Sequence, residues 1–146
     1  MTSHTNEATL RRVYDDVFSK GKLSVVDEVL DRNIVEHAPL PPGFKSVAEG
    51  LKQLISEMRT GFPDLGVAVN DLVSQGDKVW TRVTFTGTHK GSFMNIPPTG
   101  KRVSFEAMDI VRFSGGKAVE HWGVTDNMGL FTQLGAIPAP GQKPKK

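Results

Sequence analysis

One aspartate stands among apolar residues on a segment that alternates like a β-strand. Alternate residues of 101–113 differ in character, and a strand places alternate side chains on opposite faces. One face would carry Asp109 together with Val103, Phe105, Ala107, Val111 and Phe113. A carboxylate that loses hydration has a raised pKa, which suits general acid/base catalysis near neutral pH. The alternative is a structural aspartate that pairs with an arginine or accepts backbone N–H bonds.

A histidine on the next predicted strand is expected to face this aspartate. The turn Ser114-Gly115-Gly116 joins the two strands, and a hairpin centred on Gly115 places His121 directly opposite Asp109. Such a pair could handle a proton, or it could form a buried hydrogen bond that fixes the sheet. Asp126 follows the second strand and is a third candidate for acid/base chemistry. Its alternative role is the N-cap of the next helix.

Seven further side chains are candidates for contacting a substrate. Tyr14 lies on an apolar helical stripe, so its hydroxyl needs a partner. Arg82 could stabilise an enolate oxygen, or it could lie exposed in an ion pair. His37 precedes a proline turn, which also suits a simple loop hydrogen bond. The candidates for an apolar lining are Trp80, Phe105, Trp122 and Met128, although period two places Trp122 on the strand face opposite to His121.

These side chains need helices and strands to position them. Apolar residues at helical spacing predict helices over 10–18, 23–30 and 47–62, the last opened by a Ser46-x-x-Glu49 capping box. From Leu65 the period changes to two, which predicts strands over 65–73, 78–89, 101–113 and 117–124, before a short helix over 127–134. Helices followed by antiparallel strands indicate an α+β fold with the helices on one face of one sheet. Strands of about 12 residues must twist, so we expect the sheet to wrap around the helices and leave a cavity.

The composition excludes several classes of protein. The chain has 146 residues, which suits one domain, and no cysteine for a disulfide framework or a Cys-ligated metal. Its net charge of +2 includes three lysines among the last four residues, so the rest of the chain carries −1. A nucleic-acid-binding face would need a basic patch that this chain lacks. No apolar run approaches the ~18 residues of a membrane span.

The ends of the chain and the missing motifs complete these expectations. Residues 1–6 are polar without an apolar run, so we expect a flexible N-terminus, no signal peptide and a cytoplasmic protein. The domain is expected over 7–135, and the proline- and lysine-rich stretch 136–146 is expected to be a disordered tail. There is no Gly-rich phosphate loop and no histidine pair at helical metal-ligand spacing. His37, His89 and His121 are far apart in sequence, so nothing in the pattern supports a metal site, although a histidine triad stays open.

Several short motifs, taken together, resemble one family. They are Phe62-Pro63-Asp64, Thr86-Gly87-Thr88-His89-Lys90-Gly91, Ile96-Pro97-Pro98-Thr99-Gly100-Lys101, Asp109-Ile110-Val111-Arg112-Phe113, Gly116-Lys117, Glu120-His121-Trp122 with Asp126, and Gln133-Leu134-Gly135. In this order, over about residues 7–135, they are similar to the SnoaL-like polyketide (ester) cyclases. The resemblance implies the cone-shaped fold of nuclear transport factor 2-like proteins. In that fold three N-terminal helices pack on a strongly curved, mainly antiparallel sheet, and a short helix ends the domain.

The resemblance also implies an activity and a set of residues. The family's founding activity closes a ring of a polyketide ester by intramolecular aldol condensation, without a metal or organic cofactor, and its members usually form dimers through the sheet. His121, Arg112 and Asp126 match the family's pattern. The founding cyclases carry their acid/base aspartate at the position of Gly123, and a histidine at the position of Asp109.

We therefore predict a cofactor-free enzyme that binds a hydrophobic polyketide-like or ester molecule in the cone. Proton abstraction next to a carbonyl would lead to cyclisation or isomerisation, with Asp109 as acid/base and His121 orienting it or sharing its proton. One alternative is a non-catalytic binder of small molecules with the same fold. A second is an epoxide-hydrolase-like enzyme with Asp109, Arg82 and Asp126 around a water. A third is a protein-interaction scaffold with an exposed apolar patch.

Overall fold

The computed structural model of the chain describes residues 3–138 and residue 141, and its elements follow the predicted order closely. The helices are α1 (Ser3–Arg12), the π-helix η1 (Val13–Ser19), α2 (Ser24–Val29), α3 (Val47–Gly61) and α4 (Asn127–Leu134). The strands are β1 (Leu30–Glu36), β2 (Gly66–Gln75), β3 (Lys78–Thr88), β4 (Arg102–Ser114) and β5 (Lys117–Thr125). No helix in this part of the chain is long and apolar enough to cross a membrane.

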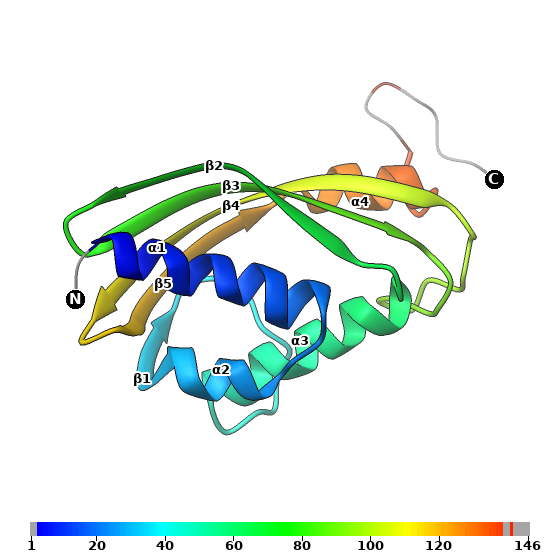
Figure 1. Cartoon of the computed structure of the whole chain (residues 1–146). Coiled ribbons are helices and arrows are strands. Elements are labelled where there is room, and N and C mark those ends of the chain that lie inside the picture. Colours follow the sequence, from blue (N-terminus) through cyan, green and yellow to red (C-terminus); the bar gives the residue numbers. More distant parts are fainter. Residues whose placement is uncertain (1–2, 139–140, 142–146) are drawn as a thin grey trace.

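The five strands form one sheet in the order β1-β5-β4-β3-β2. Neighbours pair antiparallel except for β1, which runs parallel to β5. The sheet curves over α1, η1, α2 and α3, which lie together against its concave face, while α4 lies at the far end of β4 and β5 (Figure 1). This arrangement confirms the predicted α+β fold with helices on one face of one curved sheet.

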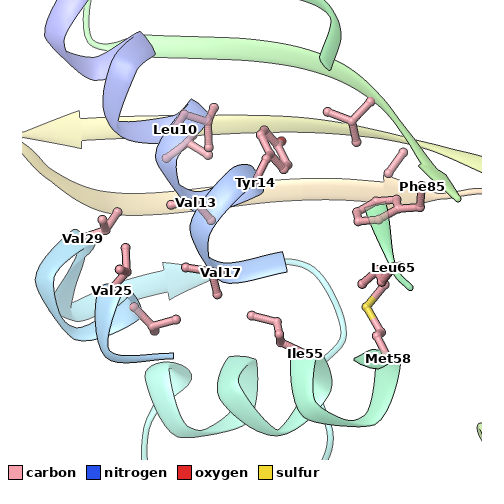
Figure 2. Packing of buried hydrophobic residues seen from close by; sticks show 14 of the residues in the cluster. Leu10, Val13, Tyr14, Val17, Val25, Val29, Ile55, Met58, Leu65 and Phe85 are labelled. Carbon is pink, nitrogen blue, oxygen red and sulfur yellow. The ribbon is translucent and has the colours of Figure 1, made fainter. Parts of the chain in front are cut away.

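The core lies between the concave face and these helices. Alternate residues of β3 are buried, among them Val79, Val83 and Phe85, while their neighbours are partly exposed on the convex face. Leu10, Val13 and Val17 contribute the apolar stripe of α1 and η1, as their spacing predicts. Figure 2 shows these side chains packed against α2, α3 and the sheet, with Tyr14 on the side of η1 that faces the strands.

Two local features differ from the expectation, and a third expectation falls mostly outside the described residues. Helix α1 begins at Ser3 and Asn6 is buried, so ordered structure begins earlier than residue 7. The helix predicted over 23–30 ends at Val29, and the chain continues directly into β1, which the apolar periodicity does not predict. Of the expected disordered tail, residues 139–140 and 142–146 lie outside the described part of the chain.

The family-like motifs near the end of α3 fasten this helix to the sheet. The carboxylate of Asp64 accepts hydrogen bonds from the backbone N–H and the hydroxyl of Thr88, at 2.7 and 2.8 Å. The backbone N–H groups of Lys90 and Gly91 donate to the carbonyl of Gly61 at the end of α3. These motifs therefore hold the scaffold together, and the candidate chemistry lies elsewhere on the sheet.

Candidate active site

The carboxylate of Asp109 lies on the concave face of β4 with a polar group at each oxygen. The hydroxyl of Tyr14, from η1, donates to Oδ2 at 2.7 Å, and Nε2 of His121 lies 2.8 Å from Oδ1. The hydroxyl of Thr81 on β3 donates in turn to the Tyr14 oxygen at 2.7 Å. Asp109 is therefore not an isolated carboxylate among apolar side chains, as its strand face suggested, but the centre of a hydrogen-bonded chain.

His121 contacts Asp109 as predicted, but the register of the hairpin between β4 and β5 differs from the predicted one. The turn has two residues, Gly115 and Gly116, both with positive φ, and a β-bulge adds one residue between Ala118 and Glu120. As a result Asp109 lies opposite Gly123, and the expected pairing with His121 is wrong by two residues. A two-residue shift keeps side chains on the same face, so His121 still reaches Asp109 along the diagonal.

Glu36 is a member of this site that the sequence does not reveal. Its Oε1 lies 2.6 Å from Nδ1 of His121 and accepts the backbone N–H of Ala38 at 2.9 Å. The glutamate reaches His121 because β1 runs parallel to β5 and pairs Glu36 with His121. The only sequence pattern that could have indicated it is the β-branched pair Ile34-Val35 before the proline-rich loop, which is typical of a short strand.

Burial and charge set the protonation states of this chain of groups. Burial alone would lower the pKa of His121, but its hydrogen bonds to the carboxylates of Asp109 and Glu36 raise the pKa to about 9. His121 is thus an imidazolium at neutral pH and donates from both nitrogens. Burial, and then the charge of Asp109, raise the pKa of Tyr14, so its hydroxyl remains a donor. The site presents one acceptor carboxylate flanked by two fixed donors.

This charge state predicts a dependence of stability on pH. The folded-state pKa of His121 is about 9, against the ordinary value of 6.5, so its contribution is fully present below pH 6.5 and is lost as the pH rises through 9. We expect the free energy of unfolding to fall by about 2–3 kcal/mol across this interval in urea titrations. His121→Gln should remove that part of the fall, and an unchanged pH profile in the variant would contradict the assignment.

The other predicted acid/base and loop residues do not join the site. The Asp126 carboxylate caps α4 by accepting the backbone N–H of Gly129 at 2.9 Å, which is the alternative role the sequence allowed. Met128 on α4 is 61% exposed. The His37 ring stacks on the Trp122 ring, with 5.0 Å between the ring centroids, and its Nε2 lies 2.8 Å from Oε2 of Glu120. Both Trp122 and Glu120 lie on the convex face, as period two predicts.

Two more candidates lie on the convex face, and one lies in the core. Trp80 and Arg82 point away from the helices, and Arg82 donates to the carboxylates of Asp71 and Glu106 at 2.7 and 2.6 Å. They cannot line a site on the concave face. The set of Asp109, Arg82 and Asp126 required for the epoxide-hydrolase-like alternative is therefore not assembled. Phe105 is on the correct face, but it is buried and stacks on Phe85 at 5.3 Å.

The approach to Asp109 is through its partly exposed side. The side chains of Asp109 and His121 are 17% and 23% exposed, so solvent reaches both. Two hollows of about 300 and 170 Å³ lie elsewhere, one between the η1–α2 turn and α3 and the other at the two hairpin turns. Within the described residues, no cluster of three or more histidine, aspartate and glutamate side chains could hold a metal ion.

A comparison with known families decides the identity of the scaffold. The family described as SnoaL-like polyketide cyclase matches residues 8–134 of this chain. The chain belongs to the SnoaL-like polyketide cyclase family. This confirms the resemblance carried by the motifs, and with it the expectation of a cyclase-type enzyme at the level of the family.

The chain is also similar to two named ester cyclases and to a solved structure. The chain is 29% identical to aklanonic acid methyl ester cyclase DauD of Streptomyces sp. (strain C5), over 76% of this chain and 67% of the relative. It is 27% identical to nogalonic acid methyl ester cyclase of Streptomyces nogalater, over 81% and 89%. AclR of Streptomyces galilaeus, a candidate hydroxylase, is 30% identical and superimposes with a TM-score of 0.81, over 95% of this chain and 85% of that one.

Proposed function

We propose that this SnoaL-like protein closes a ring in an ester-bearing polyketide by acid/base chemistry without a cofactor, with Asp109 as the base. The observation that carries the assignment is the Asp109 carboxylate, held on the concave face between the Tyr14 hydroxyl and the charged His121. The substrate class is supported by the two relatives whose names specify acid methyl esters. We propose a substrate of the same chemical class, with its ester and ketone groups at the exposed side of Asp109.

The reaction needs one proton to leave a carbon and one to reach an oxygen. Asp109 removes the proton from a carbon next to a carbonyl, and the electron pair enters the conjugated enolate. That carbon then attacks a ketone carbonyl of the same molecule, forming one C–C bond and an alkoxide. The proton held by Asp109 returns to the alkoxide, so the product is an isomer of the substrate. General base catalysis of such a step contributes about 10²–10⁴-fold in rate.

Tyr14 and His121 have supporting roles in this proposal. Both donate to Asp109 before the reaction and hold its carboxylate in one orientation. As Asp109 takes the proton, the Tyr14 hydroxyl and the His121 imidazolium stay in place beside it, and their fixed dipole and charge stabilise the developing enolate or alkoxide oxygen.

The mass of the product tests this function directly. We expect the purified protein, incubated with an aromatic polyketide acid methyl ester, to convert it repeatedly into a product of identical mass with a new ring. A gain of one oxygen would instead indicate hydroxylation, and replacement of the ester methoxy group by a hydroxyl, with release of methanol, would indicate hydrolysis. Stoichiometric binding with recovery of unchanged ester would favour the non-catalytic binding alternative. Any of these three outcomes would overturn the proposed cyclisation.

A second copy of the chain is proposed to cover the convex face. Val73, Trp80, Ile110 and Trp122 form one row across β2, β3, β4 and β5. Val124 and Met108 extend the row, and Val124 is 76% exposed. An exposed apolar row that crosses four strands of a sheet is typical of a protein interface.

Light scattering after gel filtration tests the dimer. We expect a homodimer for the wild-type chain and a monomer for Val124→Glu, because a carboxylate buried in an apolar interface costs several kcal/mol. Phe44→Glu makes the same change on an exposed residue of the loop before α3 and should stay dimeric. A wild-type monomer, or a dimer in both variants, would contradict this interface.

The location in the cell remains a prediction. We propose a cytoplasmic protein, since acid methyl ester intermediates of this kind would be made inside the cell. Cell fractionation with an antibody to the protein would test it.

A further inference from the structure

Glu36 is linked to the reacting carboxylate of Asp109 indirectly. His121 lies between them and hydrogen-bonds both. The bonds run from Glu36 on β1 to His121 on β5, and from there to Asp109 on β4. The Glu36 side chain is 9% exposed, so its charge is poorly screened by solvent. A buried carboxylate needs a partner for its charge, and the His121 imidazolium contacts Glu36 directly at 2.6 Å.

The geometry at Glu36 is more specific than simple charge neutralisation requires. Its Oε1 accepts both Nδ1–H of His121 and the backbone N–H of Ala38, so two donors hold this oxygen at the imidazole. The next backbone N–H, that of His37, donates to the carbonyl of His121 at 3.0 Å. His121 is thus held by hydrogen bonds at its backbone carbonyl and at Nδ1, and its Nε2–H points toward Asp109.

We propose that Glu36 is a positioning residue that keeps His121 charged and directed at Asp109, so that Asp109, and not His121, is the group that accepts the substrate proton. The catalytic role of Glu36 rests on the proposed function. Its effect on the charge and orientation of His121 is independent of that function. A histidine between two carboxylates cannot act as a base while it holds both protons. Without Glu36, His121 would compete with Asp109 for the proton near neutral pH.

The groups around His121 leave Glu36 as the charge that decides its state. Asp109 on β4 faces Nε2, Glu36 on β1 faces Nδ1, and Tyr14 on η1 reaches His121 only through Asp109. The neighbouring Glu120 points to the convex face, where it pairs with Arg112 and His37. Glu120 is therefore a matched control. It carries the same charge as Glu36 and is adjacent to His121 in sequence, but its carboxylate lies on the opposite side of the sheet.

The test is an NMR titration of the His121 imidazole in the full chain, with its resonance assigned by its loss in His121→Gln. We expect Glu36→Gln to lower the pKa of His121 by about one unit or more, because an opposite charge at this distance is lost while the hydrogen-bond acceptor remains. Glu120→Gln should leave it unchanged. An unchanged pKa in Glu36→Gln, or equal shifts in both variants, would overturn the proposal.

A second variant keeps the test decisive if Glu36→Gln folds poorly. Glu36→Asp retains the charge at a longer distance, so we expect the raised pKa to be largely restored. With substrate, the alkaline limb of the pH profile of kcat/KM should move with the NMR value in Glu36→Gln and return in Glu36→Asp. The titration needs no substrate, so its failure would refute the role of Glu36, whereas absence of turnover in the wild type would refute only the proposed cyclisation.

Discussion

Asp109→Asn is expected to lower kcat on a polyketide ester by about 10²–10⁴-fold, the usual contribution of a general base. The amide has the shape of the carboxylate. Its oxygen can accept from the Tyr14 hydroxyl, and its NH2 group can donate to Nε2 of His121 once that imidazole is neutral, so the fold should persist. It cannot accept the proton from carbon, which is the step the proposal assigns to this side chain. Rates from single-turnover mixing would separate the chemical step from product release.

Asp126→Asn provides the matched control. It makes the same chemical change in an aspartate that caps α4 and does not contact Asp109. Asparagine is also a good N-cap, so we expect stability and turnover close to those of the wild type. Equal losses of activity in the two variants would contradict the assignment of Asp109 as the base.

Gly123→Ala is expected to cost about 10²-fold in turnover although it removes no functional group. A Cβ at this position would lie 2.6 Å from Oδ1 of Asp109 and 3.0 Å from Nε2 of His121. The carboxylate and the imidazole would have to move apart, and a displacement of about 1 Å at a reacting group can cost this much. Because Gly123 has no side chain, it leaves room for the side chain of Asp109 from the neighbouring strand.

Gly66→Ala is the control for a methyl group added to a strand. Its Cβ would meet only the Thr86 hydroxyl, at an ordinary distance of 3.4 Å. We expect wild-type activity for it, and a crystal structure of Gly123→Ala should show the Asp109–His121 contact broken. Full activity in Gly123→Ala, with the contact intact, would show that the pair tolerates the methyl group and that its close packing has no function.

The comparison of sequence and structure shows where local patterns are informative. The stripe that includes Leu10, Val13 and Val17 predicts a helix face, and the structure buries it. The alternation in β4 places Asp109 correctly on the concave face. Both succeed because helix and strand periodicities are local properties of the chain.

Features that depend on distant partners were not predictable in the same way. Strand β1 is short, lies at the sheet edge and is stabilised by β5, which is more than 80 residues away in sequence. Because this strand was not predicted, the position of Glu36 beside His121 was not predicted either. The bulge after Ala118 shifted the register, so direct opposition of Asp109 and His121 was wrong although their contact was right. For Trp80 and Arg82 the sequence did not reveal which strand face the helices cover.

Deuterium exchange at the substrate carbon next to the carbonyl tests the central claim most directly. In D₂O the wild-type protein should incorporate deuterium at that carbon faster than the uncatalysed reaction. Asp109→Asn should bind the same ester and show no catalysed exchange. Catalysed exchange at the wild-type rate in Asp109→Asn would show that another group removes the proton, and the account of this site would be wrong.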